Sequence, residues 1–141
     1  MKRFSYRDIR NIPSLELFPN LNSLSIDGNH IQNLDFIKNN FALAELYAGN
    51  NHISNLKGSF NQLKNLRILH LQNNQISNLN YLAYELRHLS GLEDLSKLNF
   101  FKDFLIVCLD LFDNPVTFVD GYRSTMIDLL PKLRVLDRQS K

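Results

Sequence analysis

The sequence predicts a right-handed α/β solenoid with a concave parallel β-sheet, short helices or 3₁₀ turns on its convex side and a helix capping its C-terminal end. The pattern LxxLxLxxNxIxxL recurs in three successive segments, 21–34, 43–56 and 66–79. The third segment, LRILHLQNNQISNL, matches the pattern at every specified position. A further observation is that one asparagine falls at the same place of each segment, and again in a fourth segment further along the chain.

Each repeat is predicted to begin with a short strand. In the third segment Leu69 and Leu71 alternate with Ile68, His70 and Gln72, which is the period-two pattern of a strand with one buried face. A strand this short needs neighbours on both sides. The equivalent strands of the preceding and following repeats supply them, so a parallel sheet grows along the stack.

The four asparagines of the pattern are predicted to form a structural ladder. They are Asn29, Asn51, Asn74 and Asn114. Each one stands where the chain leaves its strand and turns, and a side-chain amide there can bond the backbone groups that the turn removes from water. Pattern and ladder together resemble those of leucine-rich repeat proteins, specifically the subclass with a 22-residue period.

The repeats divide the chain into five predicted parts of a single domain. Residues 1–20 form a degenerate N-terminal repeat, because counting back 22 residues from Asn29 places Arg7 at the asparagine position. Residues 21–79 form three regular repeats with apolar residues every three or four positions on the convex side, which suits 3₁₀ turns or short helices. Residues 106–119 form the last repeat, and 120–141 form a C-terminal cap.

The fifth part, residues 80–105, is predicted to be an enlarged convex segment that is largely helical. The interval from Asn74 to Asn114 exceeds one repeat by about 17 residues. Leucines recur in this segment at a helical spacing of three or four residues. They are Leu82, Leu86, Leu89, Leu92, Leu95 and Leu98.

The C-terminal cap is expected to contain a helix and one more strand. Asp120 is a candidate N-cap for a helix with apolar positions at Tyr122 and Met126. Pro131 should stop that helix, and the strand should lie near Leu133–Leu136. This helix would cover the last layer of leucines.

Composition narrows the class of protein. The 141 residues carry 16 Lys and Arg against 14 Asp and Glu, and the basic residues are spread along the chain, so direct nucleic-acid binding is not expected.

Cys108 is the single cysteine, which suits a reducing compartment. The charged start MKRFSYRDIR has no signal-peptide character, and the apolar run 104–109 is too short to span a membrane. We expect a monomer that is intracellular, nuclear and/or cytoplasmic.

The segment Asn114–Asp137 resembles the C-terminal cap of a eukaryotic leucine-rich subclass. The match is carried by Asn114, Pro115, Val116, Tyr122, Arg123, Leu130, Pro131, Leu133, Leu136 and Asp137. Similarity to the acidic leucine-rich nuclear phosphoproteins, whose long acidic tail this sequence lacks, implies an adaptor, chaperone or inhibitor for basic partners. The ending LRVLDRQSK is similar to the A-prime subunit of a spliceosomal ribonucleoprotein, which implies a subunit holding an RNA-binding protein. Phosphatase regulators of the same subclass imply a third function, phosphatase inhibition.

The concave face is the predicted binding site for a protein partner with basic and apolar groups. Alternation along the strands brings apolar and aromatic side chains to its centre, namely Tyr47, Ile68, His70 and Phe112. It also brings four acids there, namely Asp27, Glu45, Asp110 and Asp137. Arg3 is the one cation that the alternation places among them. Exposed aromatics surrounded by charge are typical of interaction surfaces.

No constellation in the sequence indicates an enzyme, a cofactor or a metal site. His30 and His52 share one place in successive repeats and should lie about 5 Å apart, but no third zinc ligand accompanies them, so we interpret them as solvated turn residues. Cys108 has no cation placed beside it to activate the thiol. His70 lacks a nucleophile and an orienting acid. The five glycines are scattered and form no phosphate-binding loop.

Overall fold

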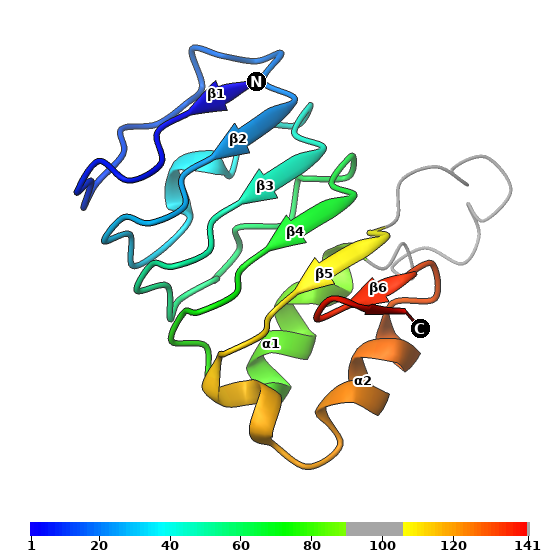
Figure 1. Cartoon of the computed structure of the whole chain (residues 1–141). Coiled ribbons are helices and arrows are strands. Elements are labelled where there is room, and N and C mark those ends of the chain that lie inside the picture. Colours follow the sequence, from blue (N-terminus) through cyan, green and yellow to red (C-terminus); the bar gives the residue numbers. More distant parts are fainter. Residues whose placement is uncertain (90–105, 141) are drawn as a thin grey trace, which may run out of the picture.

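The computed structural model describes residues 1–89 and 106–140, and its strands form a single curved sheet in chain order (Figure 1). Six strands are parallel and the seventh is antiparallel to the sixth. They are β1 (Lys2–Arg3), β2 (Ser23–Ser25), β3 (Glu45–Tyr47), β4 (Ile68–His70), β5 (Cys108–Asp110), β6 (Val135–Leu136) and β7 (Gln139–Ser140). The predicted solenoid with a concave parallel sheet is confirmed.

The register of the sheet follows the repeat pattern of the sequence. Leu24 pairs with Leu46, which pairs with Leu69, and the row continues through Leu109 to Leu136. All five side chains are fully buried. Because each leucine packs on its equivalents in the neighbouring turns, the core runs as one continuous column under the sheet.

The convex side is built from tight turns at the N-terminal end and from helices at the other end. A 3₁₀ turn, η1, spans Asp35–Ile37. Helix α1 spans Leu79–Leu86, begins with the Asn78 side chain accepting a hydrogen bond from Tyr81 N–H, and continues into η2 at Arg87–Leu89. These elements cover the first part of the predicted helical segment 80–105, and residues 90–105 lie outside the described residues.

The cap packs a second helix against the first. A 3₁₀ turn, η4, spans Pro115–Phe118, and α2 spans Tyr122–Leu129 and contacts α1 beneath the last strands (Figure 1). The expectation that Asp120 caps α2 is wrong. The N-cap is Gly121, whose backbone is left-handed with φ of 78° and whose carbonyl accepts hydrogen bonds from Thr125 N–H and the Ser124 hydroxyl. Glycine adopts this conformation at no steric cost, so the turn geometry decides the cap.

The sheet ends in a hairpin that the sequence did not indicate. Between β6 and β7 the two-residue turn is Asp137-Arg138, with φ of 50° and 65°. Two left-handed residues are the requirement of a type I′ hairpin turn, for which Asn-Gly is the usual sequence signal.

Within the described residues, no helix is long and apolar enough to cross a membrane.

Candidate protein-binding surface

The four ladder asparagines lie in line at the edge where the strands end, and each one links two turns of the solenoid. Asn51 shows the pattern: its Nδ2 donates to the carbonyls of Ala48 and Ile26, and its Oδ1 accepts from Ile31 N–H at 3.0 Å. Asn29, Asn74 and Asn114 make the equivalent bonds. None of the four is more than 6% exposed. The ladder therefore holds the sheet as a preformed surface.

The residue before each ladder position has a left-handed backbone. It is Gly28, Asn50, Asn73 or Asp113, with φ between 52° and 67°. Tyr6, which precedes Arg7, has the same conformation with φ of 56°. The corner is thus repeated in the first turn too, although Arg7 supplies only a backbone N–H, which donates to Asn29 Oδ1.

The centre of the concave face is a cluster of four half-buried side chains that we call the central cluster: Glu45, Tyr47, His70 and Cys108. The rings of Tyr47 and His70 meet edge to face with centroids 5.1 Å apart. Tyr47 donates its hydroxyl to Glu45 Oε2 at 3.4 Å, and His70 Nε2 lies 3.5 Å from Cys108 Sγ. Ile68 pairs in register with both Glu45 and Cys108, so it adjoins the cluster.

Burial keeps the thiol and the phenol of the central cluster protonated. Burial raises the pKa of the Cys108 thiol, and the negative charge of Asp110 raises it further. The thiol is therefore largely protonated at neutral pH and is a poor nucleophile. Burial also raises the pKa of Tyr47, with a second contribution from Glu45, so its hydroxyl stays a hydrogen-bond donor.

At the C-terminal end of the face an exposed aromatic ring lies beside a cation that sequence reasoning missed. Phe112 is 50% exposed, and the Arg138 guanidinium lies 4.9 Å from its ring centroid. Arg138 Nε also donates to Asp110 Oδ2 at 3.1 Å. The hairpin turn brings Arg138 back to the face, and without that turn no sequence signal places it there.

Two of the acids predicted to face a partner make hydrogen bonds within the protein. Asp110 is only 4% exposed, and its carboxylate accepts hydrogen bonds from Phe112 N–H and from Arg138. Asp137 accepts from Leu111 N–H at 2.7 Å and from the Tyr122 hydroxyl at 3.0 Å. Both carboxylates therefore satisfy donors of the protein itself, a use that the predicted outward positions did not indicate.

The two remaining predicted acids are half-buried and lie nearer the N-terminal end. Asp27 accepts from Gly49 N–H and the Ser25 hydroxyl, both at 2.9 Å, and Glu45 contacts Tyr47. With Arg3 at one end and Arg138 at the other, the face is less acidic than the sequence indicated. It has an acidic and aromatic centre with a cation toward each end.

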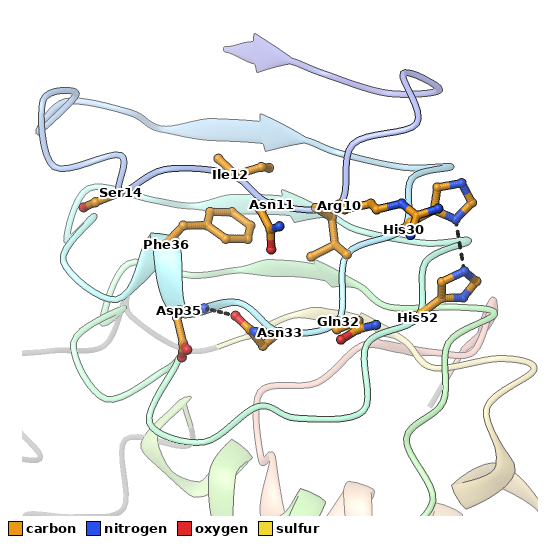
Figure 2. Close-up of a pocket in the computed structure, with 11 residues that line it drawn as sticks. Arg10, Asn11, Ile12, Ser14, His30, Gln32, Asn33, Asp35, Phe36 and His52 are labelled. Atoms are coloured by element: carbon orange, nitrogen blue, oxygen red, sulfur yellow. Dashed lines mark hydrogen bonds between the residues drawn. The ribbon is translucent and has the colours of Figure 1, made fainter.

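A separate pocket of about 520 Å³ lies off the concave face, between residues 10–14 and 30–36 (Figure 2). Phe36 and Ile12 line its middle, and His30 and His52 lie together at one end. Across residues 1–89 and 106–140, no group of three or more His, Cys, Asp or Glu side chains is arranged to hold a metal ion.

Comparisons with known proteins agree on the repeat class. Residues 42–88 match the family model for leucine-rich repeats in two copies. The chain is 42% identical over 106 residues to the acidic leucine-rich nuclear phosphoprotein 32 family member A of Drosophila melanogaster, an alignment covering 68% of this chain and 40% of the relative. It is 33% identical over 97 residues to the human leucine-rich repeat-containing protein 23, covering 69% of this chain and 24% of the relative. The chain thus spans less than half the length of these relatives.

Solved structures share the fold. A chain of the Drosophila melanogaster SNF/U2A′ complex superimposes with a TM-score of 0.73 at 23% identity, covering 98% of this chain and 72% of that one. The Leptospira interrogans protein LIC12759 superimposes with a TM-score of 0.67 at 26% identity, covering 91% of this chain and 28% of that one.

Proposed function

Since this chain is a leucine-rich repeat protein, we propose that it binds a protein partner through the concave face of its sheet. Tyr47, Ile68, His70 and Phe112 make the apolar contacts, and Asp27 and Glu45 attract basic groups of the partner. The observation that carries the proposal is the line of half-buried and exposed aromatic side chains along a surface whose backbone is fixed by the ladder.

Physical arguments favour this surface over the rest of the molecule. A preformed sheet loses little conformational entropy on binding, so more of the contact energy remains as affinity. Aromatic side chains in partly desolvated surroundings are the usual anchors of protein interfaces. Asp110 and Asp137 take a supporting function in this proposal: Asp110 positions Arg138 beside Phe112, and Asp137 fixes the turn that carries Arg138.

In this proposal the protein acts as an adaptor in the nucleus. The relative that supports it is the Drosophila acidic leucine-rich nuclear phosphoprotein, whose name states a nuclear protein. Two alternative functions would use the same face: a ribonucleoprotein subunit that holds an RNA-binding protein, and a phosphatase inhibitor. The first differs from the adaptor by a bound RNA, and the second by its effect on phosphatase activity.

The decisive variant is Tyr47→Ala combined with Phe112→Ala. Immobilised full chain should capture a defined set of proteins from nuclear extract, and the double variant should lose at least about tenfold of that capture because two interface anchors are gone. The matched control is Phe41→Ala with Phe118→Ala, which removes two exposed phenylalanines outside the strands. Urea unfolding of both variants should stay close to that of the wild type. Equal capture by wild type and the concave double variant would refute the site.

Co-purifying RNA and phosphatase inhibition distinguish the three functions. An adaptor retains its partners after nuclease treatment and brings no defined RNA before it. A ribonucleoprotein subunit brings a defined small RNA before treatment. A phosphatase inhibitor lowers phosphatase activity in proportion to the amount of pure protein added.

A further inference from the structure

One position of the repeat, immediately after the ladder position, carries groups that can bind or orient a metal ion in three successive turns. Asp8, His30 and His52 are each separated by 22 residues. Stacking places the two imidazoles with centroids 5.2 Å apart and His30 Nδ1 3.1 Å from His52 Nε2. The other nitrogen of His30, Nε2, lies 3.4 Å from Asp8 Oδ1. Figure 2 shows both rings facing each other at the end of the pocket.

We propose that His30 and His52 bind one divalent transition-metal ion of the kind that prefers imidazole, with Asp8 as a positioning residue. Zinc–nitrogen bonds are about 2.0–2.1 Å long, so two nitrogens of a tetrahedral ion lie about 3.3 Å apart. The separation of 3.1 Å between His30 Nδ1 and His52 Nε2 is close to that value. An ion therefore fits between the rings after small rotations of two solvent-accessible side chains.

Asp8 gives the pair an orientation that an isolated pair lacks. A metal-binding histidine commonly donates the N–H of its other ring nitrogen to a carboxylate, which fixes the tautomer and raises the basicity of the ligating nitrogen. Asp8 lies on that other side of His30. With its proton on Nε2, His30 directs the Nδ1 lone pair toward His52, and the ion replaces the hydrogen bond between the rings once His52 carries its proton on Nδ1.

The proposed metal site is open to solvent, and one nearby positive charge disfavours metal binding. Two imidazoles leave the remaining coordination positions to water, so the affinity should follow the usual order in which Cu²⁺ binds more tightly than Zn²⁺. Arg10 lines the same pocket, and its positive charge disfavours a bound cation. Arg10→Gln should therefore tighten binding, whereas Asp8→Asn should weaken it.

The test is calorimetric titration of Zn²⁺ into the full chain at neutral pH. All proteins carry Cys108→Ser, so that the thiol beside His70 does not add a second zinc ligand set. We expect one Zn²⁺ per chain, with His30→Ala and His52→Ala each weakening binding at least tenfold. His88→Ala removes a histidine from η2, away from this position of the repeat, and is the matched control. Circular dichroism of the metal-free variants checks that each one folds.

Arg10→Gln gives an independent readout, because loss of the positive charge beside the site should tighten Zn²⁺ binding. The proposal is overturned if the wild type takes up no Zn²⁺ at millimolar concentration, or if His30→Ala with His52→Ala binds as tightly as the wild type.

Discussion

The stacked turns and the C-terminal cap satisfy the same backbone donors by different means. After each of the first strands, an N–H donates to the carbonyl of the next turn: Ile26 to Tyr47, Ala48 to His70 and Leu71 to Asp110. Leu111 is the next residue in this series. Its N–H donates to the Asp137 carboxylate instead.

The difference shows which hydrogen-bond acceptors recur from turn to turn and which do not. Inside the stack a backbone carbonyl of the next strand accepts each time, because the following turn always offers the same groups. In the cap the chain reverses in a hairpin, and the turn of that hairpin presents a carboxylate to Leu111. The cost is a partly buried charge, which is evident in the raised pKa of Asp137.

Removing a ladder residue should have the largest effect. In Asn74→Ala the buried Ile53 N–H loses its acceptor, and the bonds from Nδ2 to Ala48 and Leu71 disappear. We expect the free energy of unfolding to fall by about 3 kcal/mol in urea titrations. Gln75→Ala, at the exposed neighbour, is the control and should change stability little. A loss no larger than the control's would mean that the ladder does not hold the stack.

Removing the cap carboxylate should cost less, because it satisfies fewer buried groups. Asp137→Ala leaves Leu111 N–H without its acceptor, and we expect a loss of about 1–2 kcal/mol in the same measurement. Asp137→Asn keeps an oxygen for Leu111 and tolerates the left-handed turn, so it should cost clearly less. Equal losses in the two variants would argue that the charge, rather than the acceptor, matters.

The helix start in the cap offers a smaller test. Gly121→Ala places a side chain at φ of 78°, where an added Cβ meets no atom closer than 3.9 Å. The penalty is therefore conformational, about 1 kcal/mol. Asp120→Ala should leave the thermal midpoint almost unchanged because Asp120 does not cap α2. A larger loss in Asp120→Ala than in Gly121→Ala would restore the original assignment of the N-cap.

The pH dependence should show the smallest effect. Burial raises the pKa of Asp137, while hydrogen bonds from Leu111 and Tyr122 partly oppose the shift. The folded state therefore holds this proton more tightly than the unfolded state does. The resulting stabilisation is fully present below the ordinary aspartate pKa of about 3.9 and is lost as the pH rises through the raised value.

The comparison that isolates this titration is wild type against Asp137→Asn. The difference in unfolding free energy, wild type minus variant, should decrease as the pH rises from below 3.9 and become constant above the raised pKa. A difference that increases over this range would show that the hydrogen bonds outweigh burial.

The concave strands were predictable because their side chains alternate in and out with a fixed period. Tyr47, Ile68, His70 and Phe112 could therefore be assigned to one face from the repeat frame. What could not be predicted was how acids on that face are used. Asp27 and Asp110 occupy outward positions of the pattern alike, yet only Asp110 is buried, because the hairpin brings Arg138 to it.

The sequence by itself determined the solenoid, the order of its strands and the register of its buried leucines, because each repeat can bury its apolar face only against the next. The tertiary structure alone decided the end of the stack: the left-handed Gly121, the Asp137-Arg138 turn and the carboxylate that accepts from Leu111. Periodicity specifies a position that has a neighbour on each side. The cap departs from the repeat, so its hydrogen bonds depend on how the chain folds back there.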